Sequence, residues 1–178
     1  MKVAGREIKG PNRVTLVLPR SDGEDIPFIA QAIVDLDEVD KYLKIPEPPS
    51  IQKAGGVIEY NRSDKGYIDQ LAQYNIKKMA WIVLKSLEPS NIEWDSVDLE
   101  NPSTWTNYQK EFREAGISDI EINRICNACM EANALDEQKI EAARQAFLHG
   151  QVAEGKNTNG PSTPAKSSSS GKPASESE

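Results

Sequence analysis

The sequence has 178 residues, a hydrophobic fraction of 38% and a net charge of −7, a length that suits one domain with appendages. The charge is uneven, because residues 1–87 hold 13 basic and 12 acidic side chains whereas residues 88–150 hold 5 and 13. The acidic second part argues against nucleic-acid binding, which requires clustered Lys and Arg. No run approaches the ~18 apolar residues of a membrane-spanning helix.

The first 34 residues have the pattern of short β-strands. In NRVTLVLPR, the side chains of Val14, Leu16 and Leu18 share one face. DIPFIAQAIVD follows after the turn residues SDGED, and KVAGREIKG before them has the composition of a short first strand. Three short strands with Gly, Pro and Asp in their turns predict a small antiparallel β-meander that requires a helix to cover one face.

The next segment, residues 35–44, has helical spacing of its apolar side chains. Asp35 is suited to the N-cap, with Glu38 three residues later as in a capping box, and Pro46 ends the helix. A long connection, PEPPSIQKAGGVIEYNRSD, then begins with prolines that favour extended geometry. A connection of this length inside a compact domain is often functional.

The longest predicted helix covers residues 64–87 and ends before Pro89. Its second half, MAWIVL, is apolar nearly all round and is therefore expected at the centre of the core.

Three shorter helices are predicted at residues 102–115, 118–133 and 136–149. In the first, Pro102 lies near the start, Gly116 follows the end, and the buried face consists of Trp105, Tyr108 and Phe112. Ser118 and Glu121 form a capping box in the second. The third begins at Asp136, ends at Gly150 and has an apolar stripe of Ile140, Ala143 and Phe147. Short links between them predict antiparallel neighbours in a small bundle.

These elements together predict an α+β fold in three parts. Residues 1–34 form a small antiparallel β element, and residues 35–150 form a helical domain packed with it as one globular unit. Residues 151–178, QVAEGKNTNGPSTPAKSSSSGKPASESE, contain almost nothing that a core would bury. A segment of this composition cannot offset its conformational entropy by burial, so we expect a disordered tail.

Both cysteines lie in RICNACMEAN as a C-x-x-C pair, a spacing found in zinc and redox sites. A structural zinc ion needs four ligands, and His149 is the only other Cys or His in the sequence. A redox pair normally begins a helix, whereas Cys126 and Cys129 lie about two turns into one, on its apolar face. The pattern therefore favours reduced thiols that pack in the core.

Other candidate sites also have simpler interpretations. The carboxylates of EWDSVDLEN do not have the spacing of a calcium loop, so a solvated acidic loop is favoured. His149 lies at a helix end, where a cation complements the helix dipole. The sequence contains no phosphate-loop, dinucleotide-binding or hydrolase motif. It predicts no enzyme, no catalytic residue, no metal and no cofactor.

The tryptophans and prolines leave two interpretations open. The tryptophans can pack the long helix against the bundle, or they can line a groove for a partner's helix or extended segment. The PEPP run can likewise be a rigid connector or a recognition element. The residues assigned to partner binding are Pro46, Pro48, Pro49, Trp94 and Trp105.

Several stretches resemble a known group of viral proteins. They are KYLKIPEPP followed by GG, then WIVLKSLEPSNIEWDSVDLENPSTW, AGISDIEINRI and EANALDEQKIEAARQAFLHGQ. In this pattern the sequence is similar, over about residues 30–150, to small proteins from the tail-morphogenesis gene cluster of tailed bacteriophages. Some members of that group are tail assembly chaperones.

The resemblance implies a non-enzymatic protein that binds the tape-measure protein, the major tail tube protein or both during tail assembly. It implies action in the host cell cytoplasm and absence from the mature virion, without nucleic acid or membrane, and with self-association possible. The alternative is a structural virion component, such as a tail completion or head–tail connector protein. A third hypothesis is a metal-dependent enzyme or redox factor that uses Cys126 and Cys129.

Overall fold

The computed structural model describes residues 1–155 except residues 4, 54, 57 and 135–136. The chain divides into two compact units, Met1–Glu137 and Gln138–Glu178. Within the described ranges, no helix combines the length and the apolar character needed to cross a membrane.

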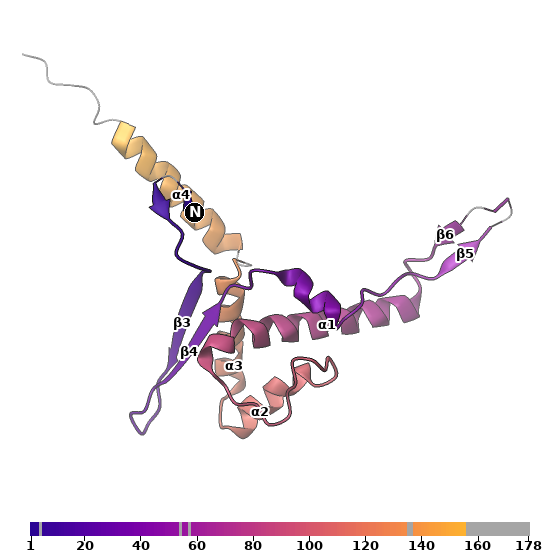
Figure 1. Ribbon diagram of the computed structural model, residues 1–178, viewed down its shortest axis with the longest axis horizontal. Helices are drawn as coiled ribbons and strands as arrows, with labels where there is room; N and C mark the ends of the chain where they lie inside the picture. Colours follow the sequence, from indigo (N-terminus) through magenta and orange to yellow (C-terminus); the bar gives the residue numbers. More distant parts are fainter. Residues whose placement is uncertain (4, 54, 57, 135–136, 156–178) are drawn as a thin grey trace, which may run out of the picture. The chain divides into compact units, whose positions relative to one another are not determined.

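The first unit contains three pairs of antiparallel strands and a set of helices, so the α+β class is confirmed (Figure 1). The pairs are β1 (Lys2–Val3) with β2 (Arg6–Glu7), β3 (Arg13–Leu18) with β4 (Ile26–Gln31), and β5 (Ser50–Gln52) with β6 (Ile58–Tyr60). The stretch before β3 forms its own hairpin instead of adding a third strand to β3–β4. All four residues of β1 and β2 are exposed, so burial gives them no reason to join the larger pair.

The β3–β4 pair contributes one face to the core. Leu18, Phe28 and Ala30 are at most 5% exposed, whereas Val17, which points to the other face, is 49% exposed. This alternation follows from the two-residue period of side chains along a strand.

Each of the five predicted helices has a counterpart among the described residues, but some bounds differ and η2 is an additional short helix. They are η1 (Leu36–Lys41), α1 (Lys65–Ser86), η2 (Glu88–Ser90), η3 (Trp105–Asn107), α2 (Tyr108–Glu114), α3 (Asp119–Ala132) and α4 (Glu137–Gly155). The segment predicted as a helix over residues 35–44 is a short 3₁₀ helix, with Asp35 as its N-cap as expected.

The helix predicted to begin at residue 102 begins instead at Trp105. The reason lies in the preceding turn, where Asn101 Oδ1 accepts hydrogen bonds from both the backbone N–H and the hydroxyl of Ser103. The Thr104 hydroxyl lies 2.8 Å from the Asn101 carbonyl oxygen and 3.0 Å from that of Asp98. Side chains that bond to the nearby backbone favour a turn over a helix. Gly116, with a φ of 82°, follows the end of α2 as predicted.

Helix α1 is buried mainly in its second half, although Tyr74 in the first half is also buried. Asp64 caps its start, because its carboxylate accepts a hydrogen bond from the Tyr67 backbone at 2.9 Å. Residues 80–84 are all buried, and Trp81 is 2% exposed. Ile68 and Ile76, in the first half, are 50% and 51% exposed. The prediction that MAWIVL lies in the core is confirmed for residues 80–84, whereas Met79 is 44% exposed.

Asn133, at the end of α3, ties the sheet side of the unit to the helices. Its Nδ2 donates to Ser86 Oγ and to the Cys129 carbonyl, each at 2.7 Å. Its Oδ1 accepts from the Ile33 backbone N–H at 2.8 Å. Ser86 is fully buried, so this amide supplies a partner that its hydroxyl needs.

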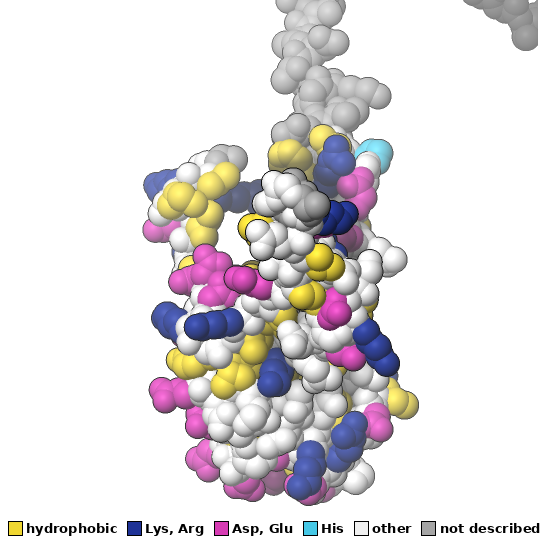
Figure 2. All heavy atoms as spheres, turned by 90° about the vertical axis from the view of Figure 1, so that its right-hand side faces the viewer, with side chains coloured by type: hydrophobic (Ala, Val, Ile, Leu, Met, Phe, Trp, Pro, Cys, Tyr) yellow, Lys and Arg dark blue, Asp and Glu magenta, His cyan; other side chains and the backbone are white. Residues whose placement is uncertain are grey.

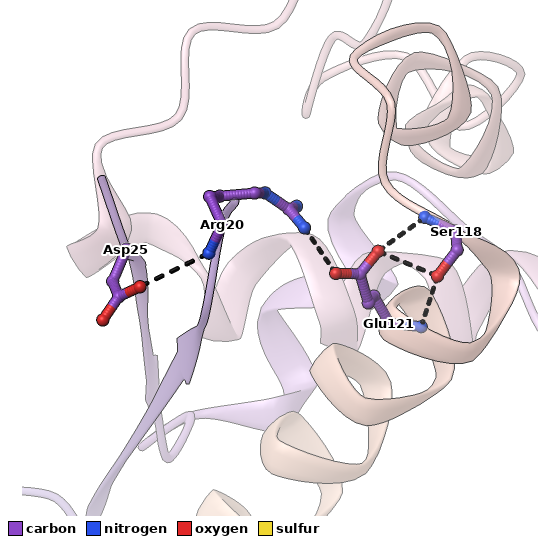
Figure 3. Close-up of polar contacts among 4 residues, drawn as sticks. All are labelled: Arg20, Asp25, Ser118 and Glu121. Carbon is purple, nitrogen blue, oxygen red and sulfur yellow. Dashed lines mark hydrogen bonds and ion pairs between the residues drawn. The ribbon is translucent and has the colours of Figure 1, made fainter. Parts of the chain in front are cut away.

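The start of α3 has the predicted capping box (Figure 3). Glu121 accepts hydrogen bonds from the backbone N–H and the hydroxyl of Ser118, each at 2.8 Å. Arg20, which follows β3, donates to the same carboxylate at 2.5 Å. One carboxylate therefore joins a helix start to the end of a strand.

The second unit is described through α4. Its described side chains, residues 138–149, are all exposed, and the predicted stripe includes Ile140 at 42% and Phe147 at 64%. The division at Glu137 differs from the expectation that residues 35–150 form one globular unit. Helix α4 continues to Gly155 instead of ending at Gly150, so residues 151–155 of the predicted tail are helical. Residues 156–178 lie outside the described residues.

Candidate functional site

A groove in the first unit has an apolar floor and an acidic rim. Its volume is about 480 Å³, and we call it the Trp94 groove. The floor includes side chains from β4, from the segment after η2 and from α2 and its end, namely Phe28, Ile92, Trp94, Phe112 and Ile117. The rim carries four carboxylates, those of Glu93, Asp95, Glu111 and Glu114.

Three aromatic rings give the floor its shape. The rings of Trp94 and Phe112 lie 5.2 Å apart between centroids, and those of Phe28 and Phe112 lie 5.9 Å apart with an edge-to-face angle of 85°. Phe28 and Phe112 are buried, whereas Trp94 is half-buried. Trp94 therefore rests on a fixed aromatic base and presents part of its ring to a ligand.

Hydrogen bonds from both sides hold the segment that carries Trp94. At its start, Ser90 Oγ accepts from the Ile29 N–H at 2.8 Å and donates to the Ile29 carbonyl at 3.0 Å. After Trp94, the backbone N–H groups of Asp95 and Ser96 donate to the Glu111 carboxylate at 3.0 and 2.6 Å. The groove is thus shaped before a ligand arrives, which lowers the cost of binding.

The hydrogen bonds that Glu111 accepts from the loop favour its ionised form. Burial alone would raise its pKa, but the Ser96 hydroxyl and the backbone N–H groups of Asp95 and Ser96 together hold the pKa below its usual range. Glu111 and Ser90 therefore both form hydrogen bonds to the backbone of the segments that line the groove.

The rim is electrostatically one-sided. No Lys or Arg occurs among the described residues that line the groove. Glu114 has a cationic neighbour in Lys110 at 3.6 Å, whereas Glu93 and Asp95 form no ion pair with any described residue. Carboxylates beside an apolar concave surface attract cations and repel anions. This arrangement is suited to a ligand in which a cationic group lies next to an apolar group.

Of the two tryptophans assigned to partner binding, only Trp94 lies at the groove. Trp105 is 0% exposed, its ring contacts that of Tyr42 at 6.3 Å between centroids, and its indole N–H donates to the Leu99 carbonyl at 3.1 Å. A ring with its polar atom satisfied inside the core has no surface to offer a partner. For Trp105 the interpretation as a packing residue is the correct one.

The prolines lie elsewhere. Pro46 lines a second cavity of about 470 Å³, beside the first half of α1, together with Leu43, Ile45 and Tyr74. Its lining contains Lys44 and Lys77 as well as Asp69, so it lacks the single sign of charge found at the Trp94 groove. Pro48 is half-buried. Pro49 is exposed, and its carbonyl accepts from the Asn61 N–H at 2.9 Å, just beyond the β5–β6 hairpin.

The C-x-x-C pair lies on the inner face of α3, as the helical spacing predicts. Cys129 is fully buried, and burial raises its pKa to about 12. Cys126 is half-buried beside the Tyr108 hydroxyl at 3.6 Å, and burial raises its pKa as well. Among the described residues no group of three potential metal ligands occurs. Thiols that stay protonated are poor nucleophiles and poor ligands.

The sequence pattern did not reveal the other residues of the Trp94 groove. Phe112 was expected on a buried helix face, but nothing paired it with Phe28 or Trp94, which lie far from it in the sequence. Glu111 carries no motif, and its role depends on the loop that folds over it. Comparisons with protein-family models, with curated proteins and with solved structures gave no match to this chain. A function has to be inferred from the groove and the sequence pattern.

Proposed function

We propose that this chain is a non-enzymatic assembly factor of a tailed bacteriophage, a tail assembly chaperone that binds the tape-measure protein, the tail tube protein or both. The observation that carries the proposal is the Trp94 groove, a preformed apolar floor with an acidic rim. The similarity of residues 30–150 to phage tail-morphogenesis proteins supports the choice of partner.

The physical properties of the chain suit such a role. A chaperone needs an accessible apolar surface to hold a partner, together with enough charge to remain soluble. The net charge of −7 opposes self-association between like copies and favours basic partners. We place its action in the host cell cytoplasm, before the tail is complete.

Co-expression with the tape-measure protein tests the proposal. The chain carries an affinity tag, and the partner is measured in the purified fraction and in the soluble lysate. We expect co-purification with the wild-type chain and its loss with Trp94→Ala. Ile120→Ala is the matched control, because Ile120 is 69% exposed on α3 and lies outside the lining of the groove. Absence of co-purification, with no gain in partner solubility, contradicts the proposal.

The alternative function is that of a structural virion component. A second surface of the molecule supports it. The β5–β6 hairpin and the first half of α1 expose Ile51, Ile58, Tyr60 and Ile68, each at 50–60%. Figure 2 views the molecule from the hairpin side and shows apolar side chains in separate patches with charged side chains between them. A permanent neighbour in a virion could cover such a surface. Abundant peptides of this chain in purified virions favour the structural role, and their absence favours the chaperone.

A further inference from the structure

We infer that the Trp94 groove binds a cationic, apolar segment of its partner, with a bulky apolar side chain on the aromatic floor and Lys or Arg beside the carboxylates of Glu93, Asp95 and Glu114. This inference rests on the proposed function, because it defines the partner chemistry of the same groove. It goes further in stating which part of a partner the groove selects.

The floor accounts for the apolar half of the recognition. The cavity of about 480 Å³ lies in the size range of pockets that enclose small ligands, so it can admit a bulky side chain. Trp94 is half-buried, and its ring leans on Phe112 at 5.2 Å. A partly exposed aromatic ring on a rigid base is typical of the centre of a binding site.

The rim accounts for the cationic half. Glu93 and Asp95 flank Trp94 directly in the sequence, are exposed, and have no ion pair with a described residue. Glu114 adds a third carboxylate from α2. An acidic segment would meet repulsion from all three, and an uncharged one would gain nothing from them.

This chain contains a segment of its own with both apolar and basic side chains, in and beside the β5–β6 hairpin, with Ile58, Tyr60, Arg62 and Lys65. Its Lys53 forms an ion pair with Glu59 of the same hairpin. The segment precedes α1, whereas the groove is lined by residues of β4, by residues 90–95 after that helix and by residues 111–117. A helix of 22 residues is roughly 33 Å long, and α1 separates the hairpin from residues 90–95 of the groove along the chain. A second copy is the competing occupant that the experiment has to separate from a foreign partner.

Peptide binding to the full chain provides the test. Three fluorescein-labelled peptides of equal length are compared by fluorescence anisotropy, with Lys-Phe-Lys, Glu-Phe-Glu or Lys-Ser-Lys at the centre of a Gly/Ser sequence. We expect only the Lys-Phe-Lys peptide to bind with appreciable affinity, and its affinity to fall about tenfold as salt rises from low to high concentration. Equal binding of the Glu-Phe-Glu or Lys-Ser-Lys peptide overturns the inference.

Variants assign the binding to the groove. We expect Trp94→Ala, and separately the triple change Glu93→Gln, Asp95→Asn and Glu114→Gln, to weaken binding at least tenfold, while Ile120→Ala leaves it unchanged. Glu111 is left intact because it holds the loop. Circular dichroism and urea unfolding confirm that each variant is folded. Unchanged binding by a folded Trp94→Ala variant overturns the inference.

The outcomes separate this inference from the proposed function. If Trp94→Ala abolishes tape-measure co-purification but the peptides do not discriminate by charge, the groove is the partner site. The inferred preference for a cationic segment is then wrong. If the charge preference holds but no tail protein co-purifies, the proposed partner is wrong and the groove chemistry stands. If sedimentation shows self-association that Trp94→Ala removes, a second copy is the occupant and the inference of a foreign segment fails.

Discussion

Glu121 is a carboxylate whose ionisation is strongly tied to the folded state. Its pKa is lowered to about 2, first by the backbone N–H and hydroxyl of Ser118 and then by the guanidinium of Arg20. The usual value for such a carboxyl is 4.5. Because the folded pKa is the lower one, the stabilising contribution is fully present above the unfolded pKa and is lost as the pH falls toward the folded one.

We therefore expect the free energy of unfolding to fall between about pH 5 and pH 2, and to fall less steeply in Glu121→Gln. Glutamine keeps the shape of the side chain but has no ionisation to lose. Urea denaturation at a series of pH values measures the difference. Glu100→Gln, at an exposed position after η2, is the control and should follow the wild type. A wild-type slope in Glu121→Gln would mean that this capping box does not contribute to the acid dependence.

The two thiols should differ in reactivity although they are three residues apart. Cys129 is fully buried with a pKa near 12, so almost none of it is thiolate at neutral pH, whereas Cys126 is half-buried. We expect a colorimetric thiol reagent to label Cys126 slowly in the Cys129→Ser variant. In Cys126→Ser, labelling of Cys129 should require unfolding. Both should react quickly in denaturing urea, and fast native labelling of Cys129 would contradict its placement in the core.

At the scale of the element, α1 is one helix with two environments. We expect Ile82→Ala, in the buried half at 5% exposure, to lower the free energy of unfolding by about 2–5 kcal/mol. Ile68→Ala, in the exposed half at 50% exposure, should change it by about 0.5 kcal/mol or less. The same substitution on the same helix controls for helix propensity. Urea denaturation measures both, and similar costs would show that the first half is also packed.

Helix starts were predictable where a cap carries the information. Asp35 and Ser118 were both predicted as N-caps, and each caps the helix that follows it. The start at residue 102 was wrong because Pro102 signals a helix equally well whether or not Asn101 bonds to Ser103. The β5–β6 hairpin was missed because its short strands have no buried side to give them a pattern.

At the scale of the molecule, the candidate site could be predicted only in part. Trp94 and Trp105 both flank the same Asn-Pro turn, and nothing in the sequence distinguishes them. Their roles are set by contacts with Leu99 and with Phe112, which depend on how the loop folds over α2. The acidic character of this half was visible from composition, and it is at the Trp94 groove that several of its carboxylates gather.

Asn133 is one of the side chains that join sheet and helices. Its substitution by alanine leaves the Ile33 N–H and the buried Ser86 hydroxyl without their partner. At about 1 kcal/mol or more for each unsatisfied group, we expect the free energy of unfolding to fall by about 2–3 kcal/mol. Thermal and urea unfolding measure the loss, and Asn127→Ala, exposed on the same helix, is the matched control.

A second substitution separates the two halves of the Asn133 amide. Asn133→Asp keeps an oxygen that can accept from the Ile33 N–H but removes the donor to Ser86 Oγ and to the Cys129 carbonyl. An aspartate near these oxygens must be buried either as an unpaired charge or in its protonated form, so we expect this variant to be the less stable of the two at neutral pH and to recover as the pH is lowered. Equal stability of Asn133→Ala and Asn127→Ala would show that the Asn133 amide does not stabilise the junction of sheet and helices.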